Sequence, residues 1–214
     1  EAINALWSDV QTLRAQAERY PFVSMLEPLS ELLDPIRGKS AAWYLTELAQ
    51  QSDVIADARE DHYSPIKRFL DGPQRAIYDD ARDYLTRQRP NLHQVDPALV
   101  APIEATLADP ACFKGQAMQQ LKTQLDALKA EVRNQIAAER ARAEQEIQRM
   151  QAQLEGLPEY GEQPDSLRAE IDNAVRAATA RLAREDHLAV IRDALHGFRD
   201  RTYPDLLARL TAPM

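Results

Sequence analysis

The chain has 214 residues, of which 44% are hydrophobic and 28% are charged, and its formal net charge at pH 7 is −8. This length is sufficient for one or two domains with a hydrophobic core, and the composition is typical of a folded soluble protein rather than of a disordered one. The acidic balance argues against a general nucleic-acid-coating surface, because such surfaces carry an excess of lysine and arginine.

The single cysteine, Cys112, leaves no second thiol for a disulfide within the sequence and suits a reducing compartment. No apolar run is long enough to cross a bilayer, and no charged-then-apolar signal segment opens the chain. We therefore expect a cytoplasmic protein without a membrane partner. The sequence starts at Glu1, without an initiator methionine and inside an amphipathic pattern, which predicts an excised piece of a longer protein.

The residue types favour helix throughout. Glycine is scarce, with only 6 in the chain, whereas Ala, Leu, Gln, Glu and Arg, which lose little on entering a helix, are abundant. The predicted fold class is all-α: a compact helical bundle over residues 1–113, followed by a long antiparallel coiled-coil hairpin arm over residues 114–214 with a C-terminal cap.

Prolines and glycines divide the first part into short helices. Pro65 and the Gly72-Pro73 pair are predicted to bracket one short helix, and Pro90 to end another. The expected helices of the bundle span residues 2–19, 22–36, 40 to past 55, 65–72, 73–89 and a short stretch centred on 103–107.

The second part begins with a long helix, because no proline or glycine occurs between Gly115 and Leu154. Apolar residues recur there at steps of three and four, with one additional step of four after Val132, which is typical of a coiled-coil seam with a stutter. At this length the helix would extend about 60 Å. The predicted seam comprises Met118, Leu121, Leu125, Leu128, Val132, Ile136, Ala143, Ile147, Met150 and Leu154.

A returning helix is predicted to cover this seam. It is capped by Asp165 or Ser166 and carries a matching apolar stripe at Leu167, Ile171, Val175, Ala178, Leu182, Leu188, Ile191 and Leu195. Antiparallel pairing places Leu154 near Leu167 at the tip and Leu121 near Leu195 or Phe198 at the base. Tyr203-Pro204 is expected to end this helix, and Leu206, Leu207 and Leu210 to cap the base.

The middle of the hairpin has two special features. The polar stretch 139–146 is expected to lie on a solvated arm. Small residues are predicted to let the two helices approach closely, with Ala137, Ala138, Ala141 and Ala143 facing Ala174, Ala177, Ala178 and Ala180.

The stretch "DPIRGKS", residues 34–40, ends like a phosphate-binding loop. Such a loop needs a glycine five residues before its Gly-Lys-Ser and a strand leading into it, whereas Leu33 occupies that position here within helical spacing. We interpret Gly38 as the end of one helix and Ser40 as the N-cap of the next.

Other candidates for chemistry have simpler structural interpretations. The four histidines, His62, His93, His187 and His196, match no metal-ligand spacing and are predicted to be surface residues. Cys112, next to Lys114, could be an activated nucleophile, but a half-buried structural thiol is the favoured interpretation. The carboxylate pairs Glu60-Asp61 and Asp79-Asp80 are expected on solvated helix faces. The sequence thus assigns no catalytic, cofactor-binding or metal-binding residue.

Aromatic and basic residues raise the question of nucleic acid. Trp43, Tyr44, Phe69, Tyr78 and Tyr84 could stack on bases, but their helical spacing among leucines predicts core positions. The hairpin arginines could contact phosphates; they alternate with Glu131, Glu139, Glu144, Glu146, Glu170 and Glu185, so pairing along the arm is the default. These arginines are Arg133, Arg140, Arg142, Arg149, Arg168, Arg176, Arg181 and Arg184.

Three phrases together carry a resemblance: "GKSAAWYLTELAQQSD", "PIKRFLDGPQRAIYDDARDYL" and "LADPACFKGQAMQQLK", followed by an alanine-rich hairpin and "LPEY". They resemble the C-terminal helical region of the BrxC family, the large P-loop ATPases of BREX bacteriophage-exclusion systems. The resemblance implies a cytoplasmic antiviral protein whose full-length parent binds ATP and Mg²⁺, with the nucleotide-binding residues outside this segment.

The expected function is therefore a non-catalytic interaction or assembly module of a BREX phage-defence ATPase. It would mediate self-association or the docking of other BREX proteins, and it would need no cofactor of its own. The alternative is a nucleic-acid-contacting arm that uses the hairpin arginines, which the acidic net charge weakens. An isolated enzyme is the third possibility, and it lacks a candidate base, nucleophile or metal cluster.

Overall fold

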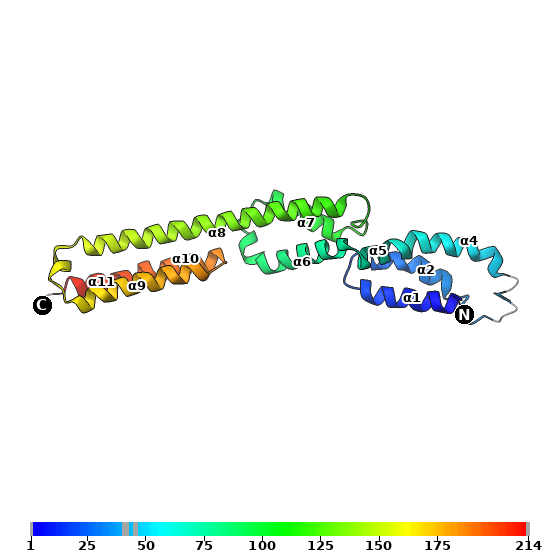
Figure 1. Cartoon of the computed structure of the whole chain (residues 1–214), viewed down its shortest axis with the longest axis horizontal. Helices are drawn as coiled ribbons and strands as arrows, with labels where there is room; N and C mark the ends of the chain where they lie inside the picture. Colours follow the sequence, from blue (N-terminus) through cyan, green and yellow to red (C-terminus); the bar gives the residue numbers. More distant parts are fainter. Residues whose placement is uncertain (1, 40–42, 45–46, 213–214) are drawn as a thin grey trace. The chain divides into compact units, whose positions relative to one another are not determined.

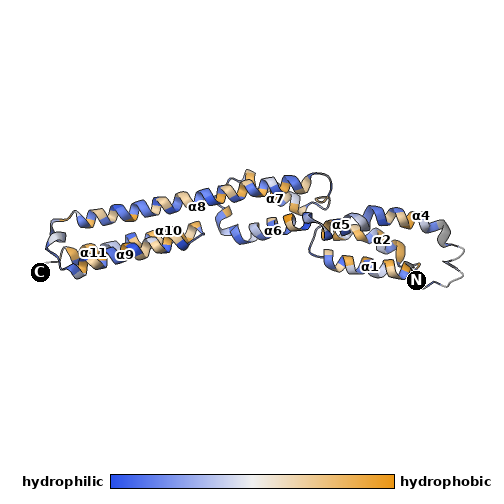
Figure 2. Cartoon of the chain, in the orientation of Figure 1, coloured by the Kyte–Doolittle hydropathy of each residue, from blue (hydrophilic) through white to orange (hydrophobic). Residues whose placement is uncertain are grey.

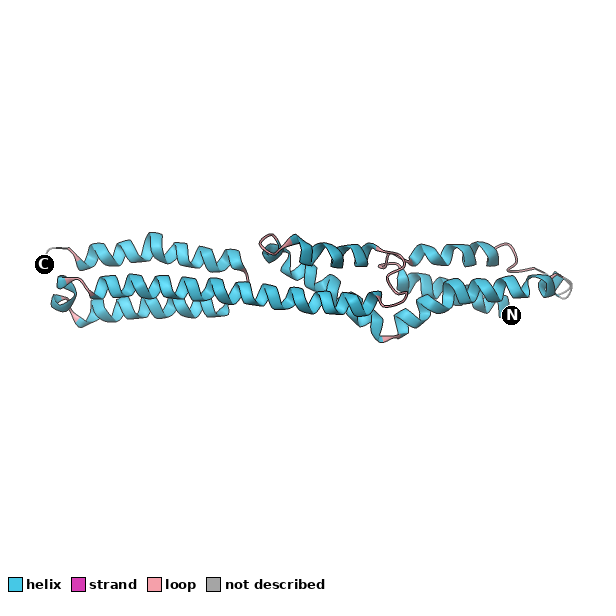
Figure 3. Ribbon diagram, turned by 90° about the horizontal axis from the view of Figure 1, so that it is seen from above, coloured by secondary structure: helices cyan, strands magenta, loops and turns pink. Residues whose placement is uncertain are grey.

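A computed structural model describes residues 2–39, 43–44 and 47–212. Over this part of the chain the ordered elements are all helical and no strand is present, which confirms the all-α class (Figure 3). The helices assemble into two compact units, the first formed by residues 1–86 and 97–127 and the second by residues 87–96 and 128–214. Two helices contribute to both units, so the division by packing falls inside helices and away from the expected boundary at residues 113 and 114.

The first unit is built from short helices (Figure 1). The helix predicted over 22–36 is shorter than expected, because it is preceded by a 3₁₀ turn and followed by a turn that runs to Gly38. The elements are α1 (Ala2–Ala17), η1 (Val23–Leu26), α2 (Glu27–Leu33), α4 (Leu48–Ala58), η2 (Arg59–Tyr63), α5 (Ser64–Asp71), α6 (Pro73–Leu92), α7 (Pro97–Ala108) and the start of α8 (Ala117–Glu155).

Pro65 does not interrupt the helical path as predicted. A π-helical turn, η2, joins α4 to α5, and the Ser64 N–H donates to the carbonyl of Arg59, five residues back. Proline lacks an N–H and clashes with the carbonyl four residues before it in a regular α-helix, so a wider turn just ahead of the ring relieves that conflict. The same device recurs at Pro204, where the Tyr203 N–H donates to the Phe198 carbonyl.

The core of the first unit is aromatic. Phe22 has no exposed surface and contacts Phe69 edge-to-face at 4.9 Å between ring centroids and Phe113 at 5.1 Å. Tyr20 stacks on Phe22 at 5.2 Å and meets Tyr78 edge-on at 5.1 Å. Offset and edge-to-face pairs are favoured because the positive ring edge meets the negative face. Of the five aromatic residues predicted to be core, Phe69, Tyr78 and Tyr84 are buried, whereas Trp43 and Tyr44 are only partly buried.

The seam predicted for the long helix is confirmed. α8 spans 39 residues, and hydrophobic and hydrophilic residues alternate along it (Figure 2). Nine of the ten predicted seam positions are buried: Met118, Leu121, Leu125, Leu128, Val132, Ala143, Ile147, Met150 and Leu154. The remaining one, Ile136, is partly buried against the core of the second unit.

The predicted two-helix hairpin is wrong for the second unit, because the chain changes direction once more after α9. α9 (Asp165–Arg184) is followed by a short break, and α10 (Leu188–Gly197), η4 (Phe198–Thr202) and α11 (Tyr203–Leu210) then run back beside α9 (Figures 1 and 3). Three helical segments, namely α8, α9 and α10–η4–α11, therefore pack together where the sequence predicts two. The short 3₁₀ turn η3 (Pro158–Glu162) makes the connection between α8 and α9.

Two hydrophobic clusters establish this reversal. Leu154 and Leu167 share one cluster, as predicted for the tip, and Leu206 and Leu210 belong to it as well. The final helix therefore covers the tip and not the base. Leu195 and Phe198 pack in the other cluster, around Ala143, Ile147 and Met150, far along α8 from the predicted partner Leu121.

The predicted alanine interface is mostly wrong. Ala143 is buried and Ala174 and Ala178 pack against the same cluster, but the other predicted residues, Ala137, Ala138, Ala141, Ala177 and Ala180, are exposed. The physical reason is the third layer: α10 and η4 lie against α8 and α9, so large side chains such as Ile191 and Phe198 fill the space between them.

Candidate functional site

The Gly-Lys-Ser stretch forms a turn and not a phosphate cradle in its described part. Leu33, at the position where a phosphate-binding loop needs glycine, is fully buried at the end of α2. Gly38 adopts a positive φ of 74° after α2, a left-handed conformation that suits glycine at the end of a helix. Ser40, predicted as the next N-cap, lies outside the described residues.

The histidines stay dispersed. His93 and His196 are exposed, as predicted for surface residues. His62, in η2, and His187, before α10, are partly buried, and the Nδ1 atom of each is buried without a hydrogen-bond partner in the described structure. Within residues 2–39, 43–44 and 47–212, no group of three His, Cys, Asp or Glu side chains is placed to hold a metal ion.

Cys112 is a core thiol rather than an activated nucleophile. Its side chain is completely buried, which is more than the half burial that the sequence predicts. Burial raises the pKa of the thiol to about 11, and Asp109 acts in the same direction. The favoured interpretation of a structural thiol thus agrees with the structure, and the alternative of activation by Lys114 does not, because the reactive thiolate is disfavoured at neutral pH.

Asp79 is a structural anchor and not a solvated surface carboxylate. Its carboxylate accepts hydrogen bonds from Arg19 at 2.6 Å and from the Tyr20 hydroxyl at 3.1 Å, and it lies 3.7 Å from both Arg75 and Arg82. These contacts tie the segment that follows α1 to α6, next to the aromatic core to which Tyr20 belongs. Glu60, from the other predicted pair, accepts from Ser64 and Arg68 on α5.

The hairpin arginines pair with glutamates much less than predicted. Among the residues named for that pattern, Arg142 and Glu139 approach to 3.9 Å, whereas Arg133, Arg140 and Arg176 donate to backbone carbonyls. Arg168 pairs with Asp165 and Glu170 with Arg209. Arg149, Arg181 and Arg184 form no ion pair with another described residue and are exposed.

The break between α9 and α10 is held by two residues that the sequence does not single out. Arg140, on α8, donates to the Leu182 carbonyl at 3.0 Å and to the Glu185 carbonyl at 2.6 Å. The last carbonyls of a helix have no partner within it, and a cation there also complements the helix dipole. Arg140 therefore caps the end of α9.

Asn91, at the end of α6, holds the other side of the same break. It is completely buried, its Nδ2 donates to the Asp186 carbonyl at 3.0 Å, and its Oδ1 accepts from the Leu188 N–H at 2.9 Å. Leu188 is the first residue of α10, so this bond satisfies a helix N–H that has no partner within the helix. The polar stretch 139–146 is thus part of a packed junction and not a solvated arm, since Glu139 also binds Arg192 at 2.7 Å.

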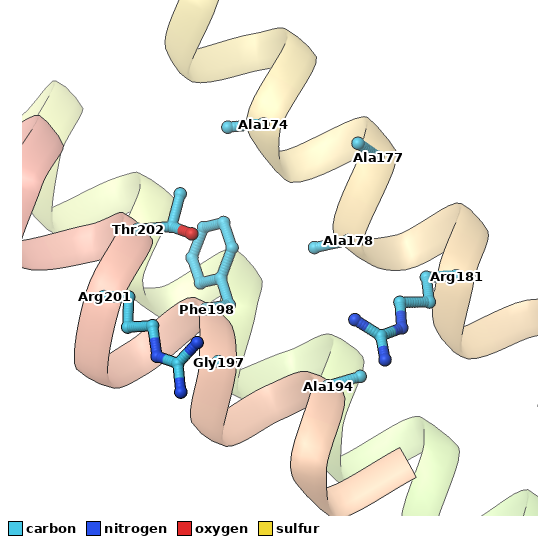
Figure 4. A pocket seen from close by; sticks show the side chains of 9 residues that line it. All are labelled: Ala174, Ala177, Ala178, Arg181, Ala194, Gly197, Phe198, Arg201 and Thr202. Atoms are coloured by element: carbon cyan, nitrogen blue, oxygen red, sulfur yellow. The ribbon is translucent and has the colours of Figure 1, made fainter. Parts of the chain in front are cut away.

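A groove opens between α9 and the α10–η4 segment (Figure 4). Its volume is about 440 Å³. Arg181 on α9 and Arg201 on η4 stand on opposite walls, and neither forms an ion pair with another described residue. The space between them is lined by small or buried residues, namely Ala174, Ala177, Ala178, Ala194, Gly197, Phe198 and Thr202.

Further charged residues lie in a hollow that adjoins one end of this groove. Asp193, His196 and Asp200 lie beside Arg181 and Arg201 in an adjoining hollow, and Asp200 is already paired with Arg199 at 2.7 Å. The Arg199 guanidinium lowers the pKa of the Asp200 carboxyl. The groove can accommodate apolar atoms on its floor and carboxylates at its arginine-bearing walls.

Comparison with known protein families gives a match for the first part of the chain. Residues 1–92 match the family described as "BREX ATP-binding protein BrxC alpha helical domain". The matched segment ends with the last residue of α6, so it includes the first two phrases of the resemblance, whereas "LADPACFKGQAMQQLK" and the hairpin lie beyond it. No curated protein and no solved structure matches the chain.

Proposed function

Because residues 1–92 match the alpha-helical domain family of the BREX ATP-binding protein BrxC, we propose that the chain is a non-catalytic interaction and assembly module of a BREX phage-defence ATPase. The module associates with further copies of itself or docks other BREX proteins. It acts in the cytoplasm, as part of a larger ATPase.

The observation that carries this proposal is the combination of an extensive helical surface with a groove that no described side chain fills. The groove between α9 and α10–η4 is open, and its two wall arginines have no ion-pair partner among the described residues. The backbone polar groups around the α9–α10 break, in contrast, already form hydrogen bonds with Arg140 and Asn91. An apolar floor flanked by charged residues suits the recognition of another protein.

ATP, which the family description names, does not fit the residues of the Gly-Lys-Ser stretch. A phosphate cradle requires a glycine-flanked loop with free N–H groups, and the corresponding position here is the buried side chain of Leu33. In our proposal, ATP and Mg²⁺ are bound by another part of the parent ATPase.

The described helices include none that is long and apolar enough for a membrane span.

A second candidate function is contact with a nucleic-acid backbone. The observation in its favour is that Arg149, Arg181, Arg184 and Arg201 are exposed and not neutralised by ion pairs with described residues. The net charge of −8 opposes it. This candidate requires duplex binding that weakens steeply with salt, because each phosphate contact releases a counterion.

The test of the proposed module is a binding experiment. The purified chain is immobilised and exposed in turn to soluble copies of itself, to each other protein of the same BREX system, and to duplex DNA at low and high salt. Saturable protein binding is expected. Binding to DNA alone would support the second candidate, and binding to none of the three would overturn the proposed module.

A further inference from the structure

We propose that the groove between α9 and α10–η4 receives helix α4 of a second copy of the chain. This inference deepens the proposed function and depends on it, because it names the surfaces through which the module assembles. It follows from two exposed features of the molecule, a groove with arginines on its walls and a helix face that carries carboxylates.

The first feature is the groove itself. Small side chains at Ala174, Ala178 and Gly197 leave room for the close approach of another helix. The two wall residues, Arg181 and Arg201, add two positive charges with no ion-pair partner in the described part of the chain. An occupant therefore needs a narrow apolar strip flanked by carboxylates.

The π-helical turn η4 contributes to this opening. Phe198 begins the turn and is buried, at 4% exposure, whereas Arg201 within the turn is exposed on the groove wall (Figure 4). A π-helical turn changes the angular spacing of side chains, so this turn supplies the groove with both the buried Phe198 and the exposed Arg201. Such turns occur often at functional sites.

The second feature is on α4. Val54 is 55% exposed, and it is the single large hydrophobic residue that is exposed among the described ones. Asp53 and Asp57 are exposed beside it, and neither forms an ion pair with another described residue. Residues at positions 54 and 57 share a helix face, with Ala58 adjoining. α4 therefore presents the apolar residue and the carboxylates that the groove requires.

The docking surface and its occupant are different surfaces of the same chain. Such a heterologous contact leaves one free groove and one free α4 on every pair, so copies add successively into a ring or a filament. The contact is small and includes charges that remain near solvent, so we expect weak association that rises with concentration and weakens with salt.

The test uses charge reversal with mixing. One variant carries Arg181→Glu and Arg201→Glu, and the other carries Asp53→Arg and Asp57→Arg. Each variant alone brings like charges together, so its apparent dissociation constant in sedimentation equilibrium should rise about tenfold or more. In an equimolar mixture both contacts regain opposite charges, and association should return.

Matched controls carry the same charge changes elsewhere on exposed positions. They are Arg149→Glu with Arg184→Glu, and Glu104→Arg with Asp126→Arg, and both pairs should associate as the wild type does. Thermal unfolding followed by circular dichroism verifies that every variant is folded.

Three outcomes would overturn the proposal: a wild-type chain that stays monomeric, reversed variants that still associate, or a mixture that fails to regain association. If the reversed variants associate, the assembly function stands and only the assigned surfaces are wrong. If the wild type neither associates nor binds a BREX protein, both proposals fail. Loss of DNA binding in the Arg181→Glu/Arg201→Glu variant, with self-association intact, would assign the groove to nucleic acid instead.

Discussion

The two units of the chain reach a stable interior by different means. In the first unit, the rings of Tyr20, Phe22, Phe69, Tyr78 and Phe113 form one connected aromatic cluster. In the second, the clusters consist mainly of aliphatic residues on long helices, and hydrogen bonds from side chains to the backbone hold the turn between α9 and α10. The packing of aromatic rings determines the fold of the first unit, whereas hydrogen bonds at helix ends determine where the chain of the second unit turns.

The largest expected effect comes from removing a ring of the aromatic cluster. Phe69→Ala should lower the free energy of unfolding of the first unit by about 3–5 kcal/mol, because the buried ring leaves a cavity and its edge-to-face contacts are lost. Chemical denaturation measures this change. Phe69→Leu, which keeps most of the volume, should lose clearly less, and equal losses would show that the ring contacts, and not the filled volume, account for the stability.

A smaller but sizeable loss is expected at the buried amide of the second unit. Asn91→Ala leaves the Leu188 N–H and the Asp186 carbonyl without partners, which should cost about 2–3 kcal/mol. Hydrogen exchange should show the start of α10 opening first. The exposed Asn173→Ala on α9 is the control, with an expected change within about 0.5 kcal/mol. Similar results for both variants would contradict the role of Asn91.

Arg140 should show a more moderate effect. Arg140→Met keeps much of the aliphatic stem but removes both bonds to the end of α9, and the expected loss is about 1–2 kcal/mol because the site is partly solvated. Arg142→Met, two residues away, changes an exposed side chain with one long ion pair and should lose about 0.5 kcal/mol or less. Equal unfolding midpoints would mean that α9 ends without help from Arg140.

The effect expected to be smallest at neutral pH is a pH dependence of the first unit, which develops only in alkaline solution. Because burial raises the pKa of Cys112 from 9.0 to about 11, the folded state holds a proton that the unfolded state releases between these values. Stability should therefore fall as the pH rises from 9.0 to about 11. Cys112→Ala should show a shallower decline over this range, and parallel declines would exclude the thiol as the cause. Tyr78, whose pKa is raised to about 12, adds a similar decline at higher pH in both proteins.

Periodicity predicts the elements of this fold better than their connections. The seam of α8 follows from steps of three and four, which the structure confirms from Met118 to Leu154. The change of direction after α9 is indicated only weakly in the sequence. The apolar residues Leu182 and Leu188 are six positions apart, a spacing that does not keep both on one helix face. Pro65 and Pro204 predict breaks, yet π-helical turns carry the chain past both.

The candidate groove could not be predicted because it depends on the reversal. Arg181 is visible as a surface cation in the sequence, but Arg201 comes from a segment that a two-helix hairpin places elsewhere. Asn91 and Arg140 are equally hidden, since their partners lie far along the chain, at Leu188 and at Leu182 and Glu185. A buried asparagine after Pro90 carries no local pattern that distinguishes it from a turn residue.

The measurement that tests the proposed assembly function most directly is the molar mass of the chain, determined by light scattering behind a sizing column over a wide range of concentration. Our account predicts a mass that rises with concentration and falls back toward that of one chain, 24.2 kDa, at high salt. A mass that stays at this value at every concentration, together with no binding to the other BREX proteins, would contradict it.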